Sequence, residues 1–357
     1  MKKKSLYLLL LLITFSACDF GFIDRPQLAV QTSESFYKTA DDAKSAVTAV
    51  YNYFQMYDFE VSKFEFGDIA SDDAEKGGES DNDRPFVKDM EYFRTRSDNY
   101  SCLVMWKICF KAIYQANYAI ENITPIDMDT SLKERFIAEI RFIRAHFYFF
   151  LTNIFGEVPL ITQVLSANDY HQARATSSAI WEQIEADLIF ARDNLPLKSK
   201  YDETDLGRIT KGAAQALLAN VYLFQKKWEM AEKEADEIIQ SGEYKLESQF
   251  SDIFQIKKTD FGVESILEIP HQTTNTGWGD DNEGSVVPVF CRSRNSGGWG
   301  FNCPTYDLLS EFEPGDPRLV HTFMFDGDIT EDEVQFNQYS PSHLCSRKIF
   351  LTPSERV

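Results

Sequence analysis

The 357-residue sequence predicts a mainly α-helical protein in which helices pack in antiparallel pairs, followed by a loop-rich portion with short strands. Apolar residues recur at three- and four-residue intervals from about Asp41 to Gly242, as on one face of an amphipathic helix. A helix-turn-helix pattern of large and small side chains lies near the end of that stretch. Beyond about Phe261, glycine, asparagine, serine, aspartate and proline become frequent, which is typical of loops.

Residues 1–17 resemble a bacterial export signal. Lys2–Lys4 form a positive start, Leu6–Phe15 an apolar run, and Ser16 and Ala17 a small-residue end before Cys18. The apolar run is shorter than the roughly 20 residues that span a bilayer. A cysteine directly after small residues resembles a lipobox, so Cys18 is the candidate lipidation site. Phe15 stands where that box usually has leucine, and cleavage without lipidation is the alternative.

Four helices are expected before residue 200. The first begins at Asp41 in "ADDAKSAVTAVYNYF", where carboxylates complement the positive helix end. The second covers about Cys102 to Glu121, and the fourth about Ser178 to Asn194. The third contains "EIRFIRAHFYFFLTNIF" and is expected to begin with a capping box in which Ser131 is followed by Glu134, and to end at Gly156.

The third helix is dense in aromatic residues, which a membrane, an active site or a core would each explain. Glu139, Arg141 and Arg144 interrupt any apolar run of membrane-spanning length, so we expect a core helix with Glu139 and Arg144 ion-paired in the scaffold. His146 lies two turns from Glu139 among aromatic residues. A histidine in such surroundings is more often a core residue than a catalytic one.

The segment "ITKGAAQALLANVYLFQKKWEMAEKEADEIIQSGEYKL" predicts two short helices joined by a tight turn. Its spacing of large and small residues matches a tetratricopeptide unit at Leu218, Ala219, Tyr222, Trp228, Ala231, Ala235 and Ile238. Alanines let the two helices approach closely, while the tyrosine and the tryptophan are expected to fill the sides. Such units need neighbours to bury their faces, and the earlier helices supply them.

Charge and cysteine content exclude two classes of function. The formal charge is −20, and about −23 without residues 1–17, so binding to nucleic acid phosphates is not expected. After Cys18 an odd number of cysteines remains with no CxxC pair: Cys102, Cys109, Cys291, Cys303 and Cys345. A metal site is therefore not expected, and buried free thiols are the simpler interpretation.

The loop-rich portion supplies the candidate ligand-binding residues. Trp278 and Trp299 lie in polar, glycine-rich segments, "HQTTNTGWGDDNEGSVVPV" and "RSRNSGGWGFNCPTYDLL". An indole face can stack on a sugar ring while polar side chains such as Asn295 and Asp280 bond its hydroxyls. The alternative is that each tryptophan only anchors its loop to the helical scaffold. A short strand, "SILEIP", is expected between the loops.

No motif for a cofactor, a metal or catalysis is present. The acidic stretch Asp68–Asp83 lacks the regular ligand spacing of a calcium loop, and a solvated surface loop is favoured. The glycines do not form a phosphate-binding GxGxxG or GxxxxGK[ST] sequence. Neither GxSxG nor HExxH occurs, so the sequence gives no sign of an enzyme.

Several blocks together resemble the SusD/RagB family of outer-membrane nutrient-binding lipoproteins from Bacteroidetes-type bacteria. They are "CDFGFIDRP", "ESFYKTADDAKSAVTAVY", "AEIRFIRAHFYFFLTNIFGEVPLI", "ITKGAAQALLANVYLFQKKWEMAEKEADEII" and "GGWGFNCPTYDLLSEFEPGDPRL". The third and fourth are the most specific.

The resemblance implies a SusD-like helical scaffold, a loop-rich ligand face and a lipid anchor in the cell outer membrane. It also implies a partner, a SusC-like TonB-dependent transporter, to which captured glycans or other nutrients pass unchanged. The expected organisation is a signal peptide over 1–17, a helical region over 18–260 and a loop-rich region over 261–357. Family members usually continue beyond "RKIFLTPSERV" with a further helical segment, so a truncated reading frame is expected.

Two other functions stay open from the sequence. A tetratricopeptide-like adaptor would bind a protein on its concave surface and use its tryptophans structurally. A helical glycoside hydrolase would need two carboxylates about 5–10 Å apart in a cleft.

Overall fold

The computed structural model describes residues 36–254, 260–271, 284–329 and 342–348. The chain divides into two units, Met1–Lys38 and Thr39–Val357, and the first contributes only residues 36–38 to the description. The expected signal peptide, Cys18, Trp278 and Asp280 therefore lie outside the described residues. All helices and strands among the described residues belong to the second unit.

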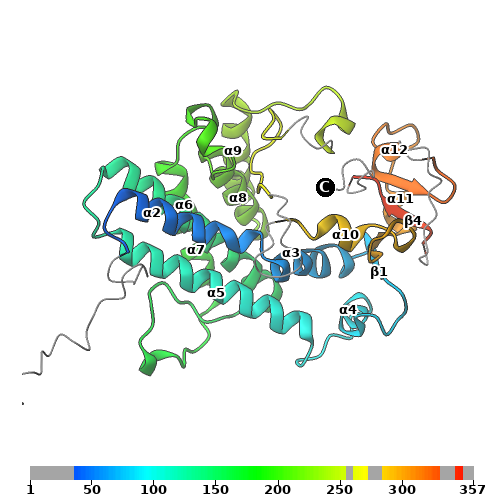
Figure 1. The fold of residues 1–357 in the computed structure, drawn as a ribbon, viewed down its shortest axis with the longest axis horizontal. Helices are drawn as coiled ribbons and strands as arrows, with labels where there is room; N and C mark the ends of the chain where they lie inside the picture. The colour runs from blue at the N-terminus through cyan, green and yellow to red at the C-terminus, as the bar shows by residue number, and fades with distance from the viewer. Residues whose placement is uncertain (1–35, 255–259, 272–283, 330–341, 349–357) are drawn as a thin grey trace, which may run out of the picture. The chain divides into compact units, whose positions relative to one another are not determined.

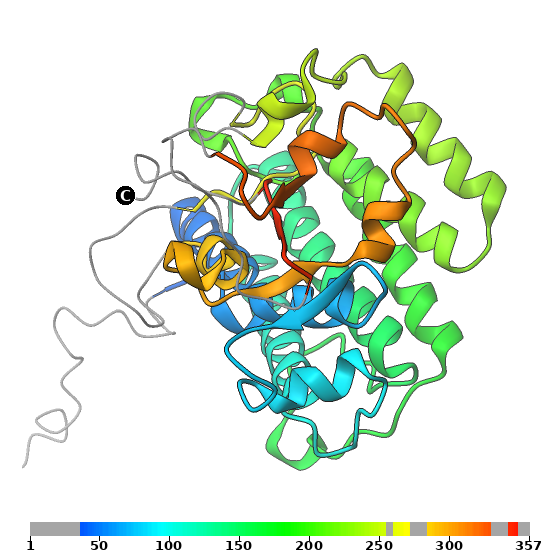
Figure 2. The same ribbon diagram turned by 90° about the vertical axis from the view of Figure 1, so that its right-hand side faces the viewer.

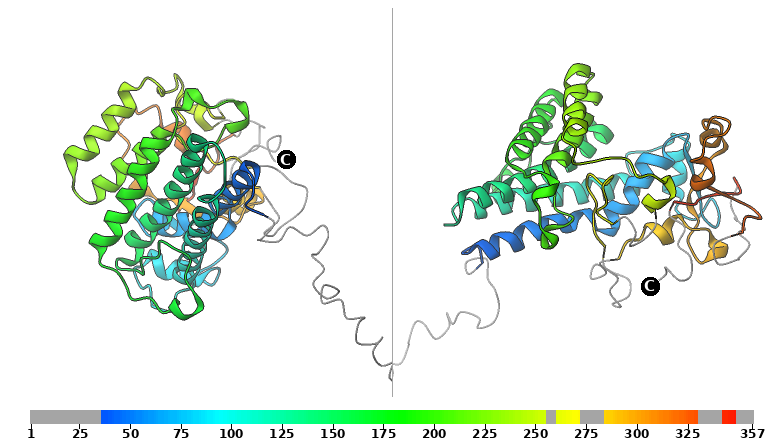
Figure 3. Two further views of the ribbon diagram at one scale, coloured as in Figure 1. Left: turned by 90° about the vertical axis from the view of Figure 1, so that its left-hand side faces the viewer. Right: turned by 90° about the horizontal axis from the view of Figure 1, so that it is seen from above.

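Most of the second unit is helical, as predicted (Figure 1). Its longer helices are α2 (Ala40–Tyr51), α5 (Tyr100–Ile123), α6 (Thr130–Phe155), α7 (Ser177–Asn194), α8 (Lys211–Phe224) and α9 (Trp228–Gln240). From α5 onwards each of these helices packs against the next one in the chain, and α2 packs against α5 and α6 (Figure 3). This is the serial arrangement expected of stacked helix pairs.

The start of α6 corrects one prediction. Asp129 is the N-cap, and its carboxylate accepts a hydrogen bond from the Leu132 backbone N–H at 2.8 Å. The predicted capping box at Ser131 is wrong, because the Ser131 hydroxyl instead donates to the Asp129 carboxylate at 2.6 Å. The helix ends as predicted before Gly156, which adopts a φ of 71°.

The aromatic face of α6 forms core, as predicted. Phe147 is fully buried and lies in a cluster with Phe54 and Phe59, at ring-centroid distances of 5.7 and 4.8 Å. The half-buried His146 ring contacts the same cluster, 5.0 Å from the Phe54 centroid. Desolvation, helped by the charge of Lys63, lowers the pKa of His146 to about 3. The imidazole is therefore neutral at physiological pH.

Two buried charge networks tie the helices together. Arg144 of α6 forms a fork of two 2.8 Å hydrogen bonds with Asp187 of α7, which has no exposed surface. Glu139 is equally buried and pairs with Arg135 at 3.1 Å and Arg208 at 2.8 Å. Glu139 and Arg144 are thus ion-paired in the scaffold as expected, each with partners on other turns or segments.

Helices α8 and α9 form the predicted helix pair, with one correction. Tyr222 and Ala231 are buried between the helices, as their spacing indicated. Trp228 is 58% exposed and fills no gap in the pair. It is the first residue of α9, at the turn that joins the two helices.

A smaller part with short strands adjoins the bundle. It contains α3 (Tyr57–Phe64), α4 (Pro85–Glu91), α10 (Val287–Cys291), α11 (Tyr306–Ser310) and α12 (Leu319–Thr322). Strand β1 (Ala74–Gly77) pairs antiparallel with β2 (Phe301–Pro304), and β3 (Phe323–Phe325) with β4 (Leu344–Ser346) (Figure 2). Segments that are far apart in the sequence are therefore paired. The β1–β2 pair joins a segment before residue 260 to one after it, and the predicted division of the chain at residue 260 stays a prediction.

Two local expectations are wrong. "SILEIP" at residues 265–270 is not part of a strand. The acidic stretch Asp68–Asp83 is not simply a solvated loop, because it contains β1, in which Lys76 is only 1% exposed. The Lys76 ammonium donates to the carbonyls of Gly77 and Ser80, which explains how a lysine is buried there.

All five cysteines among the described residues are free thiols. Four are buried, as the sequence suggested, and Cys102 is half-buried.

Candidate ligand-binding surface

The segment Cys291–Gly300 forms a tight loop that places Trp299. The Trp299 backbone N–H donates to the Val289 carbonyl at 2.7 Å, and the Gly300 N–H donates to the Arg292 carbonyl at 2.8 Å. A Cβ atom on Gly298 would lie 2.1 Å from that same Arg292 oxygen. Only glycine permits this close approach of two backbone segments, so the "GGWG" sequence fixes where the indole is presented.

The Trp299 side chain lies between the core and the surface. Its indole is half-buried and meets Phe290, a fully buried residue of α10, edge-on at 6.4 Å. On its other side it meets the Tyr57 ring edge-on, also at 6.4 Å, and Tyr57 is 43% exposed. Trp299 therefore anchors its loop and also forms, with Tyr57, an aromatic surface that is open to solvent. We call these two residues the aromatic pair.

One arginine contacts each member of the aromatic pair. Arg84, which precedes α4, reaches the Tyr57 hydroxyl at 3.4 Å and forms an ion pair with the buried Glu65. Arg294 donates to the Trp299 carbonyl at 3.1 Å and to the Glu79 carboxylate at 3.0 Å. Each guanidinium thus holds one member of the pair in place while a carboxylate neutralises it.

The other predicted site residues lie in two places. Asn295 is exposed in a short 3₁₀ turn, Arg294–Ser296, on the loop that carries Trp299. Trp278 and Asp280 lie in the segment 272–283, outside the described residues. The structure thus brings Asn295 and Trp299 onto one loop.

Described residues that flank segment 272–283 on both sides contact Glu60 of α3. The buried Glu60 carboxylate accepts hydrogen bonds from the Ser285 hydroxyl and the Val286 N–H, both at 3.0 Å, and lies 3.2 Å from His271 Nε2. Burial alone would raise the pKa of Glu60, but the hydrogen bonds from His271 and Val286 outweigh it and lower that pKa. Glu60 therefore holds the residues on either side of the segment against the same helix.

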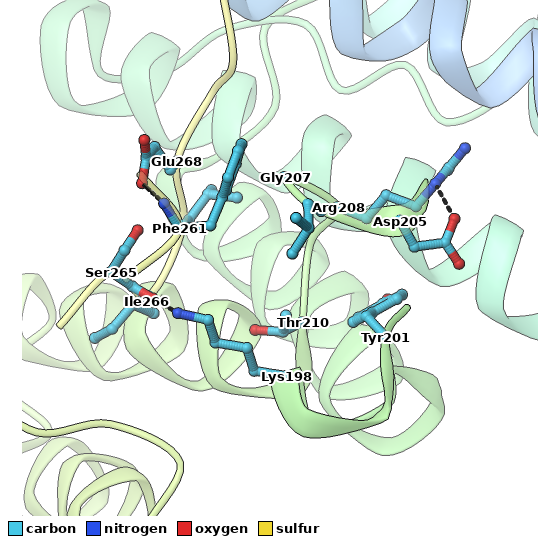
Figure 4. A pocket seen from close by; sticks show the side chains of 12 residues that line it. Lys198, Tyr201, Asp205, Gly207, Arg208, Thr210, Phe261, Ser265, Ile266 and Glu268 are labelled. Carbon is cyan, nitrogen blue, oxygen red and sulfur yellow. Dashed lines mark hydrogen bonds and ion pairs between the residues drawn. The ribbon is translucent and has the colours of Figure 1, made fainter. Parts of the chain in front are cut away.

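Two cavities lie elsewhere and do not suit a sugar. The first, shown in Figure 4, has a volume of about 30 Å³ and lies where residues 198–210 meet residues 261–268. Its charged groups are already satisfied, since Lys198 donates to the Gly262 and Ser265 carbonyls and Arg208 pairs with Asp205. The second, of about 360 Å³, is lined by Glu247, Asp260, Glu264 and Glu268 but by no aromatic side chain. Sugar sites usually offer an aromatic face, which the described lining of the second cavity lacks. Tyr201 and Phe261 line the first cavity, but its volume is too small for a sugar ring.

Within the described ranges no group of histidine, cysteine, aspartate and glutamate residues could hold a metal ion. In the same ranges no helix combines the length and the apolar character needed to cross a membrane.

Sequence reasoning did not identify Tyr57, Arg84 or Glu60. One signal was available, because Glu60 lies in α3 directly beside apolar core residues such as Phe59 and Val61. A carboxylate on a buried helix face needs a hydrogen-bonding partner. The spacing alone, however, does not reveal that the partners lie more than two hundred residues away.

A helical-repeat scaffold with an aromatic surface on a glycine-rich loop defines the class, a binding protein of the stacked-helix type. A family model described as starch-binding and associating with the outer membrane (SusD-like) matches residues 32–223, more than half of the chain. The chain belongs to this SusD-like family. Two solved structures that share the fold are named as a laminarin-binding and a glycan-binding protein, and the chain is a non-catalytic member of the family.

Curated relatives of the chain are also named SusD-like. The chain is 26% identical over 356 residues to SusD-like protein P2 of Formosa agariphila, covering 95% of this chain and 68% of that protein. It is 28% identical over 284 residues to a SusD-like protein of Bacteroides ovatus, covering 75% of this chain and 49% of the relative. The chain thus spans from about half to two thirds of the length of these relatives.

Solved structures share the fold. A laminarin-binding SusD-like protein superposes with a TM-score of 0.78 at 28% identity, covering 90% of this chain and 74% of that one. Surface glycan-binding protein A from Bacteroides thetaiotaomicron, solved with laminarihexaose, gives 0.75 at 21% identity, covering 88% and 72%. At 21% identity, the similarity to surface glycan-binding protein A shows only that the two proteins share a fold.

Proposed function

We propose that this protein captures glycans at the cell surface with the aromatic pair and passes them unchanged to a SusC-like TonB-dependent transporter. The observation that carries the proposal is the geometry of Trp299 and Tyr57. Aromatic faces that are partly exposed and rigidly held suit the apolar face of a sugar ring, and neighbouring polar groups can bond its hydroxyls.

The ligand contacts follow from that geometry. Trp299 and Tyr57 form the stacking surface, and Asn295 on the same loop supplies polar contacts. Trp278 and Asp280 extend the site from segment 272–283, whose flanking residues Glu60 holds. This assignment is supported by the shared loop and by the likeness to a laminarin-binding protein of the same family.

The anchor and the partner complete the proposal. Residues 1–17 direct export, Cys18 carries the lipid, and the protein stays in the outer membrane beside its transporter. Two or more acyl chains would hold it there durably. Replacing Cys18 by alanine should move the protein from the membrane fraction to the soluble fraction of a Bacteroidetes host, whereas a lipid-independent anchor would leave it in the membrane fraction.

Affinity electrophoresis in gels that contain laminarin or another neutral glucan tests the binding function. The protein should be retarded, and Tyr57→Ala should restore its mobility while its circular dichroism stays unchanged. A folded protein that no glycan retards would contradict the proposal.

A protein-binding role is the second candidate, since large apolar side chains are exposed at the α8–α9 pair. They are Leu223, Phe224, Trp228 and Ile239, each at least 50% exposed. If they form the transporter contact, Phe224→Ser with Trp228→Ser should abolish co-purification of the transporter but leave glycan binding intact.

A further inference from the structure

We infer that the aromatic pair selects uncharged glycans and rejects uronate-containing or sulfated ones, because Arg84 and Arg294, the two arginines that hydrogen-bond to it, are already neutralised by this chain's own carboxylates. The inference rests on the proposed function and adds the class of glycan. An arginine recognises a carboxylate or a sulfate through a fork of N–H donors. It can do so only if those donors are not already occupied.

Arg294 contacts the backbone of Trp299, and both ends of its guanidinium are occupied. One terminal nitrogen donates to Glu79 at 3.0 Å. The other donates to the Trp299 carbonyl at 3.1 Å and lies 3.6 Å from Asp83. Two carboxylates thus oppose one positive charge, and an incoming anion would meet net negative charge.

Asp83 is itself built into this arrangement. Its carboxylate accepts a hydrogen bond from the Glu79 backbone N–H at 3.1 Å. A Cβ atom on Gly78 would lie 3.0 Å from that carboxylate and 2.6 Å from the Phe301 ring, so the turn closes tightly around it. The two acids are therefore held beside Arg294 by the backbone of one turn.

Arg84, which contacts Tyr57, is also not free to bind an anionic sugar. Its guanidinium forms an ion pair with Glu65, a residue that is only 1% exposed. The same guanidinium lies over the rings of Phe86, Phe290 and Phe301. The nearby Lys88 is similarly opposed, by Asp81 at 3.6 Å and Glu91 at 3.5 Å. With a formal charge of −20 for the whole chain, the long-range field also disfavours polyanions.

The test compares neutral and anionic oligosaccharides of equal length on the full mature chain. Laminarihexaose and other neutral hexasaccharides are titrated beside hexamers of alginate and polygalacturonate, at low and at physiological salt. The wild type should bind at least one neutral ligand and bind each anionic ligand at least tenfold more weakly.

A gain-of-function variant makes the test specific to Arg294. The pair Glu79→Gln and Asp83→Asn removes both opposing charges and keeps the hydrogen-bonding shapes. It should bind an anionic hexamer at least tenfold more tightly than the wild type, and salt should weaken that gain. The matched control, Glu232→Gln with Asp236→Asn, removes the same charge from exposed positions on α9, away from α10 in Figure 1.

The possible outcomes distinguish a failure of the inferred selectivity from a failure of the proposed glycan capture. Tight binding of an anionic hexamer by the wild type overturns the inference and leaves glycan capture standing. A variant that stays folded yet gains no anion binding, or no more than the control gains, overturns it as well. If no glycan of either class binds, the proposed function fails and the inference fails with it.

Discussion

The indole of Trp299 lies edge-on to the phenol of Tyr57, with 6.4 Å between the ring centroids, although the two residues are far apart in the sequence. Tyr57 is the first residue of α3, and Trp299 ends a glycine-rich loop just before β2. Pairing of β1 with β2 brings these segments together. The candidate ligand-binding surface therefore depends on long-range packing and not on one loop alone.

Gly298→Ala should weaken glycan binding because the added Cβ would lie 2.1 Å from the Arg292 carbonyl oxygen. The backbone must shift, and Trp299 moves with it. We expect a loss of about tenfold in affinity, on the order of 1.4 kcal/mol, with helical content unchanged by circular dichroism. Gly67→Ala is the matched control, because nothing lies within 4 Å of its added Cβ. Equal effects of the two substitutions would argue against a positioned indole.

Asp187→Asn should destabilise the helical scaffold strongly. The substitution leaves the buried Arg144 guanidinium without its counter-charge, and breaking a buried pair in this way typically costs about 3–5 kcal/mol. Asp193→Asn is the control, since that carboxylate is 55% exposed and pairs with Arg192 at the surface, where about 0–1 kcal/mol is expected. Urea unfolding at pH 7 measures both, and similar losses for the two variants would contradict the network's role.

Glu60→Gln should remove part of the pH dependence of stability. The pKa of Glu60 is lowered in the folded protein, so its carboxylate contributes stability above its unfolded pKa of about 4.3 and loses it as pH falls through the lower folded value. The variant should be less stable than the wild type at pH 7, by about 1–3 kcal/mol, and the gap should narrow towards pH 3. Chemical unfolding at pH 7 and pH 3 measures the free energy of unfolding of each variant, and Glu232→Gln, at an exposed position, is the reference. A gap that stays constant with pH would show that the carboxylate charge is irrelevant.

His146 should make the stability of the protein fall at a higher pH than the one at which Glu60 acts. Its folded pKa is about 3, whereas an unfolded histidine titrates near 6.5, so below about pH 6.5 the unfolded chain takes up a proton that the folded one does not. Stability should fall as pH drops from 6.5 towards 3, by up to about 1.4 kcal/mol per pH unit, and should be unaffected by this group above 6.5. His146→Phe should flatten the slope between pH 6 and 4. An unchanged slope in His146→Phe would show that the imidazole is already protonated in the fold.

Much of the helical scaffold could be predicted from the sequence because helical periodicity is a local signal. The apolar faces of α2, α5 and α7 and the end of α6 at Gly156 follow from spacings of three and four residues. The start of α6 was misplaced because Asp129 and Ser131 are both good capping residues, and only the backbone geometry decides between them. Trp228 matched a repeat pattern, but its burial depends on where the helix contact ends.

The ligand surface could be predicted only in part. Trp299 was identified because tryptophan in a polar, glycine-rich loop is a local signal. Tyr57, Arg84 and Glu60 were missed because their roles arise from contacts with segments far along the chain, such as the pairing of Ala74 with Pro304. Short strands carry little sequence signal, since a run of four residues fits several structures.

The most direct test of glycan capture is the affinity of the mature chain for laminarihexaose, measured calorimetrically for the wild type, Tyr57→Ala and Trp299→Phe. Tyr57→Ala should lose about tenfold or more in affinity, on the order of 1–2 kcal/mol. Trp299→Phe keeps an aromatic ring against Phe290 and should lose less, with thermal stability close to that of the wild type. Saturable binding that depends on Tyr57 and Trp299 is the predicted result. Binding that both variants retain in full would place the glycan elsewhere and contradict capture by the aromatic pair.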